Sequence, residues 1–230
     1  ESQPGIEVNG LLGPRAYYAV GVAQPEAEGG SDAGARTSVY YKLRYKLGGL
    51  RLDGRYDRLD GPRPGGYGQL LDRSVIIEHF GYFGTTTLDD GTVDAHRSFG
   101  ASLRILNGRF DAGAGVVVRR DDDPWARGVG SEMTSVFGKA EYSPLPWLIG
   151  SFKVERFRAR SAGAERIGYT EGAVDRVRLA PGAIALIRQN VRFVVEGELY
   201  AVDRSPAAAA ASRPATSRPA ALVMRLDFAF

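Results

Sequence analysis

Cysteine is absent from this chain of 230 residues, and histidine occurs only twice, at His79 and His96. Without a thiol, the chain has no Cys–His catalytic pair and no Cys-x-x-Cys-His motif for attaching its own c-type haem. A Ser–His–Asp triad would have only two candidate bases. No run of about eighteen apolar residues occurs either, which excludes a transmembrane helix. We therefore predict that the protein is not an enzyme and has no catalytic residues.

The charged residues are close to balance, with 30 Lys and Arg against 27 Asp and Glu. Basic and acidic residues are interleaved along the chain, which argues against a nucleic-acid-binding surface. Mean hydropathy is slightly negative, at −0.22. A transmembrane β-barrel is compatible with such an average, because half of its strand residues face water.

Apolar and charged residues alternate with a period of two over residues 39–47, where Leu43 stands between two basic residues. This period predicts a β-strand with one apolar and one polar face. The alternation resumes over residues 50–57, after Gly48-Gly49. Two glycines between such runs predict a two-residue hairpin turn. The charged face is too costly to bury in a dry core, so we expect it to meet water.

A second hairpin is predicted around Asn107-Gly108, between alternating runs over residues 99–105 and 110–118. Asn-Gly is the strongest short hairpin signal, and a turn at these two residues pairs Ile105 with Phe110. Further alternating runs cover residues 136–142, 151–155, 191–199 and 222–230. The same amphipathic strand pattern is thus repeated to the end of the chain.

Short and long connections alternate between the predicted strands. The short ones are Gly13-Pro14, Gly48-Gly49, Asp72–Ser74, Asn107-Gly108, Ser143–Pro146 and Arg188–Asn190. The long ones are Ala23–Ala35, Arg58–Gly65, Thr85–Ala95, Arg120–Gly130, Arg160–Gly168 and Asp203–Pro219. In outer-membrane barrels the short turns are periplasmic and the long loops extracellular. The last long connection is low in complexity, and we expect a flexible Ala/Pro-rich loop over residues 204–220.

These patterns predict an all-β fold: a single antiparallel outer-membrane β-barrel over residues 1–230, with about 12–16 strands. Our best count is about thirteen, which is odd, whereas bacterial single-chain barrels have even numbers. Counting back from a periplasmic Phe230 places residue 1 outside the cell. We therefore expect missing N-terminal strands, or a neighbouring chain, to complete the barrel, although one miscounted strand would also restore an even number.

The alternation assigns side chains to two faces. We predict that the lumen is lined by Lys42, Arg44, Lys46, Arg51, Asp53, Arg55, Asp57, Arg104, Arg109, Asp111, Lys139, Glu141, Lys153, Glu155, Arg192, Glu196, Glu198, Arg225 and Asp227. We predict that the membrane is faced by Tyr41, Leu43, Tyr45, Leu50, Leu52, Phe110, Val116, Phe152, Phe193, Leu226, Phe228 and Phe230. Aromatic residues near strand ends, Trp147 among them, are expected at the lipid headgroup level.

Several motifs resemble those of outer-membrane porins that are encoded beside multihaem cytochromes, and they match the C-terminal part of that family. They are Tyr17–Val22, Leu47–Gly54, Gly81–Gly84, Arg97–Ala101, Ala140–Tyr142, Pro146–Ile149, Pro181-Gly182, Leu186–Val191 and the terminal Phe230. The resemblance implies further strands before Tyr17. It also implies either a diffusion pore or a sheath around a partner's multihaem cytochrome, so that haem would be present only through that partner.

No residue set predicts a metal or cofactor site. His79 is read as an ordinary strand residue rather than a ligand, and Asp121-Asp122-Asp123 as a solvated loop tip, because it lacks the ligand spacing of a calcium loop. The charges of the lumen face are equally consistent with bracing pairs and with ion selectivity. The sequence thus supports two hypotheses for a bacterial outer-membrane protein in contact with lipid: a porin-like channel for small solutes or ions, or a structural sheath.

Overall fold

The computed structural model describes residues 5–24, 37–55, 72–87, 90–123, 130–161, 173–188, 191–204 and 220–228. Every regular element in these ranges is a β-strand, and the strands form one antiparallel sheet in sequence order. The strands are β1 (Gly5–Leu12), β2 (Ala16–Ala23), β3 (Ser38–Gly48), β4 (Arg73–Thr87), β5 (Val93–Asn107), β6 (Phe110–Asp121), β7 (Ser131–Leu145), β8 (Leu148–Ser161), β9 (Ala173–Arg188), β10 (Val191–Arg204) and β11 (Ala220–Phe228). The predicted all-β antiparallel fold is confirmed.

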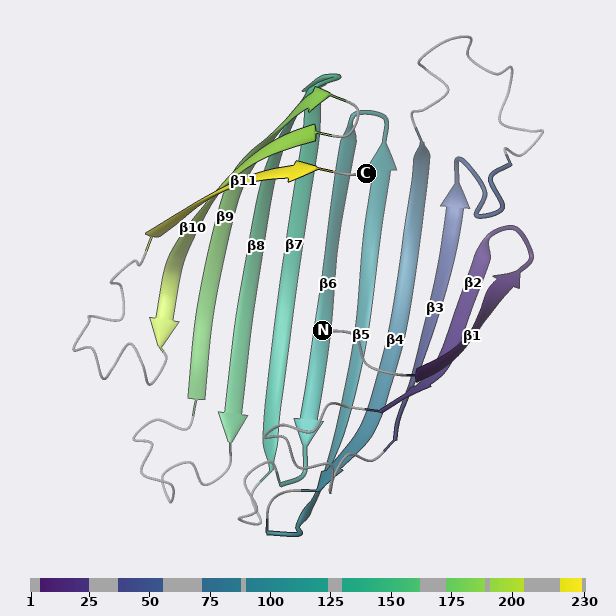
Figure 1. Ribbon diagram of the computed structural model, residues 1–230, viewed down its shortest axis with the longest axis vertical. Helices are drawn as coiled ribbons and strands as arrows, with labels where there is room; N and C mark the ends of the chain where they lie inside the picture. Colours follow the sequence, from purple (N-terminus) through teal and green to yellow (C-terminus); the bar gives the residue numbers. More distant parts are fainter. Residues whose placement is uncertain are drawn as a thin grey trace.

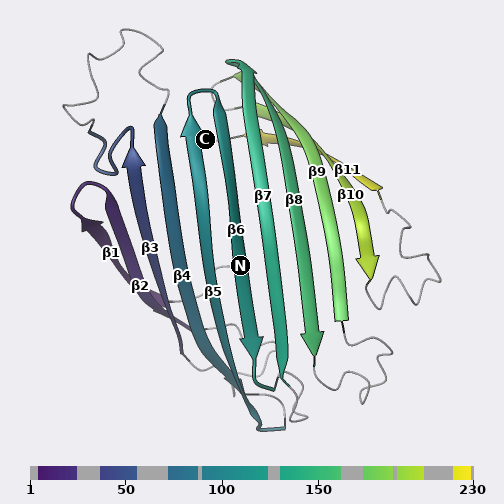
Figure 2. The ribbon, with the colours of Figure 1, turned by 180° about the vertical axis from the view of Figure 1, so that it is seen from behind.

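The sheet is a single curved layer, with β1 and β11 at its two opposite edges (Figures 1 and 2). Its 11 strands in the described ranges are fewer than the 12–16 predicted. Within those ranges β1 pairs only with β2, and β11 only with β10. Within the part of the chain that the structure describes, no pairing between the two edges closes the sheet into a barrel. The described part also contains no helix long and apolar enough to cross a membrane.

The hairpin between β5 and β6 is present, with a different register from the predicted one. Asn107 pairs with Phe110, and Ile105 pairs with Ala112 instead of Phe110. The two turn residues are therefore Gly108, which has a φ of +63°, and Arg109. The pairing differs by two residues, and an even shift leaves every side chain on its predicted face.

The predicted strand after Gly48-Gly49 is wrong. Both glycines have positive φ, as a tight turn requires, but residues 49–55 form turns and bends, and β3 pairs with β4. The reason lies at Asp53-Gly54, a turn-forming pair in which Gly54 has a φ of +82°. The Asp53 carboxylate accepts a hydrogen bond from the amide of Arg55 (3.2 Å), which bends the chain instead of extending it.

This correction removes several predicted positions from the sheet. Leu50 and Leu52 do not lie on a membrane-facing strand, and Arg51, Asp53 and Arg55 do not lie on a lumen-lining one. Residues 50–55 instead contact the β1–β2 turn, where the amide of Leu52 donates to the carbonyl of Pro14 (2.9 Å). Asp57, Phe230, the predicted Arg58–Gly65 loop and a strand expected over residues 65–71 lie outside the described residues.

The connections separate the sheet into two ends, which we call the turn end and the loop end. The turn end holds the β1–β2, β5–β6, β7–β8 and β9–β10 turns together with the longer β3–β4 connection, and the loop end holds the remaining connections. The predicted long loop over residues 85–95 is shorter, because β4 continues to Thr87 and β5 begins at Val93. Residues 205–219, most of the predicted flexible loop, lie outside the described ranges.

At the turn end, the carboxylate of Asp72 holds the β3–β4 connection to β3. It accepts hydrogen bonds from Lys46 (2.5 Å), from the amide of Leu50 (3.0 Å) and from Ser74 (3.1 Å). Burial acts to raise the pKa of Asp72, but these hydrogen bonds outweigh it and hold the pKa below its usual range. Lys46 is itself buried, so the pair neutralises a charge that water reaches poorly.

We expect Asp72→Asn to destabilise the protein by about 1.5 kcal/mol at neutral pH, the lower end of the scale for a hydrogen bond to a charged group, because Asp72 is partly exposed. Because the folded-state pKa of Asp72 is lowered, its contribution is present above the unfolded pKa and is lost as pH falls through the folded value. Urea unfolding in detergent at several pH values measures this. The difference between the two proteins should shrink on acidification, and a difference that grows would contradict the assignment.

Candidate functional site

Cross-strand register gathers charged residues from most of the sheet onto one face, which we call the charged face. One row of directly paired residues runs across seven strands, and directly paired residues point to the same side. The row contains Arg44, Glu78, Ser102, Gly115, Phe137, Glu155 and Arg178. Charged residues at alternate strand positions are thus gathered on one face, with some uncharged residues among them.

Ion pairs connect neighbouring strands along this face. Glu78 on β4 accepts from Arg44 (2.8 Å) and Lys42 (3.2 Å) on β3. Arg104 on β5 donates two hydrogen bonds to Asp111 on β6, at 2.8 and 2.5 Å. Each pair joins side chains that are opposite or diagonal across two strands, the positions where opposite charges stabilise a sheet.

The most connected group is Arg178 on β9. Its guanidinium donates to Glu155 on β8 (2.8 Å) and to Glu198 on β10 (2.9 Å), so one side chain ties three strands together. Lys153 on β8 reaches past β9 to Glu196 on β10 (2.5 Å). These side chains remain partly exposed, which favours a surface in contact with water over a packed interior.

At the last pair of strands, Asp227 on β11 accepts from Arg192 on β10 (2.7 Å) and from Arg225 on its own strand (2.7 Å). Lys139 and Glu141 pair within β7 (2.8 Å). With these, every strand from β3 to β11 has at least one charged residue on the charged face.

Most of the predicted lumen-lining residues lie on the charged face. They are Lys42, Arg44, Lys46, Arg104, Asp111, Lys139, Glu141, Lys153, Glu155, Arg192, Glu196, Glu198, Arg225 and Asp227. Arg109 lies instead in the β5–β6 turn and donates to the carbonyl of Pro144 (3.0 Å). Sequence reasoning missed Glu78 and Arg178. On its own face Glu78 stands between Ile76 and Phe80, two apolar residues that obscure the alternation there.

The opposite face, which we call the apolar face, carries large hydrophobic side chains that are exposed. Leu43 is 49% exposed, Phe152 47% and Leu226 49%, values far above those of a buried core. Other side chains exposed in the same way are those of Tyr45, Phe110, Val116 and Phe193. Tyr41 also lies on this face, with its ring stacked on Phe83. Phe228 lies on β11, paired with Val191. Among the described residues only Ala19 and Ala180 are buried apolar side chains, so the sheet has no core of its own.

Charged residues also appear on the apolar face, at Arg73 of the turn end and at several positions near the loop end. Asp175 pairs there with Arg156 (2.9 Å) and Arg158 (3.5 Å), and Arg120 pairs with Glu132 (3.1 Å). The apolar surface is therefore a band that ends before the long connections begin.

Comparison with models of known protein families, with curated proteins and with solved structures found no match of any kind. The resemblance to porins encoded beside multihaem cytochromes therefore stays a prediction, and the function has to be argued from the two faces of the sheet.

Proposed function

We propose that this chain forms the wall of a bacterial outer-membrane β-barrel that lets small solutes or ions pass through a charged lumen and catalyses no reaction. The observation that carries the proposal is the division of one curved sheet into an exposed apolar face and an ion-paired charged face. Lipid outside and water inside satisfy both faces at once.

Energetics favour lipid as the solvent of the apolar face. Soluble monomers rarely expose contiguous apolar patches of more than a few hundred Å². Here exposed Leu, Val and Phe side chains recur across the strands, among them Leu43, Val116 and Leu226. A bilayer solvates this band. The arginine ion pairs at the loop end of the band then lie at the headgroup level, where charges are tolerated.

The ends of the sheet orient the barrel by analogy with bacterial outer-membrane proteins. The turn end would face the periplasm and the loop end the cell exterior. Trp147, which is 52% exposed in the β7–β8 turn, would mark the periplasmic interface, because its amphipathic ring favours that depth.

Closure requires partners for the two edges of the sheet. In lipid, each unpaired backbone group costs several kcal/mol, so β1 and β11 would not remain exposed at their free sides. We propose that further strands or a neighbouring chain pair with these edges to complete the barrel.

A sheath around a multihaem cytochrome is the second candidate, and the aromatic rings on the charged face favour it. Tyr40, Phe80, Tyr82, Phe137 and Phe157 project among the ion pairs. Aromatic residues and arginine are enriched where proteins contact each other. Any haem would then belong to the partner.

Purification of the full-length protein from native membranes, followed by absorbance spectroscopy and planar-bilayer recording, separates the two candidates. A colourless protein that conducts ions supports the channel, and a co-purifying haem spectrum with a blocked lumen supports the sheath. A colourless protein without conductance would contradict both.

For the channel we expect a slight anion preference, because basic residues are in small excess on the lumen wall. Lys139→Glu should shift the reversal potential toward cation selectivity. Arg156→Glu makes the same change of charge on the apolar face and should leave the reversal potential unchanged. Equal shifts in the two variants would mean that Lys139 does not face the conducting path.

A further inference from the structure

Three side chains of metal-ligand type meet at the loop end of β5 and β6. Asp94 and His96 are two residues apart on β5, and His96 pairs in register with Asp121, the last residue of β6. One ligand atom of each residue lies within 4.8 Å of the others. The prediction that Asp121 belongs to a solvated loop tip is therefore wrong, because the residue continues the β6 ladder and packs against β5.

Among the described residues, this cluster is more buried than the other charged side chains of the sheet apart from Lys46, which is paired with Asp72. Asp94 is 5% exposed, His96 8% and Asp121 3%, whereas the side chains of Arg104 and Arg225 are more than half exposed. Two carboxylates removed from water are costly unless nearby positive charge compensates them. A small, dense positive charge between them would do so.

The existing hydrogen bonds leave ligand capacity in the cluster. Asp121 accepts from Arg119 (2.6 Å) and Ser131 (3.4 Å), and Asp94 accepts from the amide of Asp123 (2.7 Å). These contacts hold both carboxylates in place, as outer-shell partners do around metal ions. Arg119 supplies one positive charge, which matches only one of the two carboxylates.

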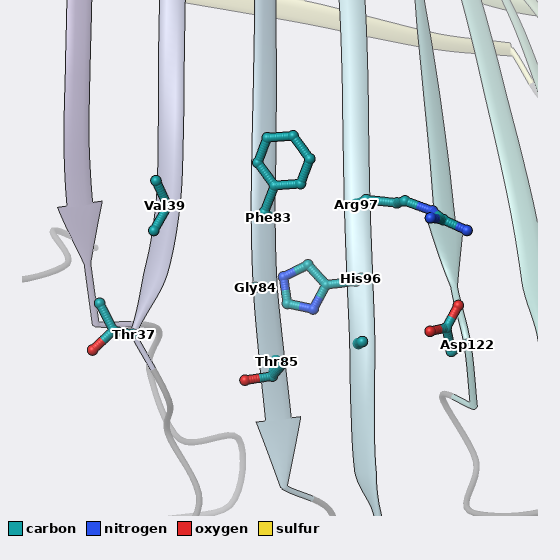
Figure 3. Close-up of a pocket in the computed structure, with 9 residues that line it drawn as sticks. Thr37, Val39, Phe83, Gly84, Thr85, His96, Arg97 and Asp122 are labelled. Atoms are coloured by element: carbon teal, nitrogen blue, oxygen red, sulfur yellow. The ribbon is translucent and has the colours of Figure 1, made fainter.

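Among the described residues, two buried polar atoms, one in His96 and one in its neighbour Ser38, have no hydrogen-bond partner. They are Nδ1 of His96 and Oγ of Ser38, whose side chain is fully buried. The imidazole projects from β5 over Gly84 on β4 (Figure 3). A Cβ at Gly84 would lie 2.5 Å from both His96 Nε2 and Ser38 Oγ, so only glycine leaves room for their approach. Buried polar atoms without partners are rare and point to a bound group.

We propose that Asp94, His96 and Asp121 bind a divalent transition-metal cation of the Zn²⁺ type, with Ser38 Oγ as a nearby fourth donor. Zinc–oxygen and zinc–nitrogen bonds are about 2.0–2.2 Å long, so ligand atoms around one ion lie roughly 3–4 Å apart. The observed separations, up to 4.8 Å, need only a small closure of the side chains. An imidazole with two carboxylates favours Zn²⁺ over Ca²⁺, which prefers oxygen ligands alone.

Such an ion would join the start of β5 to the end of β6 at the loop end of the sheet. The proposal is independent of channel or sheath function, because it depends only on side chains within the sheet. It replaces the expectation from the sequence that the chain has no metal site.

The experiment uses the full chain in detergent, freed of metal with a chelator and titrated with Zn²⁺ against a chromophoric competitor. We expect one equivalent to bind, and His96→Gln and Asp94→Asn each to weaken binding by about tenfold or more. His79→Gln is the matched control, since His79 contacts the Tyr41 hydroxyl (3.2 Å) on the apolar face and should not affect binding.

A second measurement needs no variant. The wild-type chain has only two imidazoles, so NMR of ¹⁵N-labelled histidine should show one of the two side-chain signals shifting with Zn²⁺. Four results would each overturn the proposal. They are the absence of saturable Zn²⁺ binding, binding that is unchanged in His96→Gln, a shift of the His79 signal, and a preference for Ca²⁺ over Zn²⁺.

Discussion

Val116→Arg should destabilise the membrane-inserted protein by about 2–4 kcal/mol, the cost of a basic side chain facing lipid at mid-bilayer. Val116 lies at the middle of β6, on the apolar face, and is 38% exposed. In lipid, the guanidinium has no water at that depth and no acidic partner in its cross-strand row, which holds Ala101 and Val136.

The matched control is Val117→Arg, one residue along the same strand. Val117 pairs with Gly100 and Ser135 on the charged face, where an added arginine meets water. We expect a change of less than about 1 kcal/mol there, as for an ordinary surface substitution. Urea unfolding of both variants in lipid vesicles measures the difference. Equal destabilisation would show that the two faces have the same solvent.

Gly100→Val should destabilise the protein by about 1–3 kcal/mol, the usual cost of inserting atoms into a packed site. The ring of Phe80 on β4 lies over Gly100 on β5, so that a Cβ at residue 100 would overlap the ring. Aromatic rings cover glycines elsewhere in the sheet too, as Tyr40 does at Gly21 and Phe137 at Gly115. Such pairs are a device for covering the open backbone of glycine within sheets.

A double-mutant cycle tests this contact. Phe80→Ala removes the ring, and in that background Gly100→Val should cost much less than in the wild type. Gly138→Val serves as a comparison, because a Cβ there would be 3.2 Å from Val154, a milder contact. If the cost of Gly100→Val were the same with and without the ring, the overlap would not be its cause.

Alternation was enough to predict the strand class, the antiparallel order and the faces of the charged and apolar residues. Lys42 and Leu43 lie on opposite faces because a strand has a side-chain period of two, which no tertiary contact changes. The Asn107-Gly108 hairpin was predictable for the same reason. Its predicted register was wrong by two residues, and a side-chain pattern with a period of two cannot reveal a shift of two.

The wrong predictions arise where turns and contacts between residues distant in sequence determine the structure. The run over residues 50–57 has the right alternation for a strand, but the Asp53-Gly54 turn bends it. Asp72, far along the chain, also binds the Leu50 amide, and β4 takes the place beside β3. The Asp94–His96–Asp121 cluster was equally hidden, because its residues lie on two strands and only the register brings them together. A short polar run such as 121–123 resembles any loop when it is read alone.

If the proposed function holds, lipid contacts one face of this sheet and water the other. The chain has no cysteine, so single Cys substitutions from 111 to 118 on β6, leaving out Gly115 beneath the Phe137 ring, give uniquely spin-labelled proteins. In lipid vesicles, collision rates with apolar oxygen and with an aqueous nickel reagent report the solvent of each site. We predict a period of two, with positions 112, 114, 116 and 118 in lipid and the others in water. Uniform access of the nickel reagent along the strand, or alternation in the opposite phase, would contradict the account.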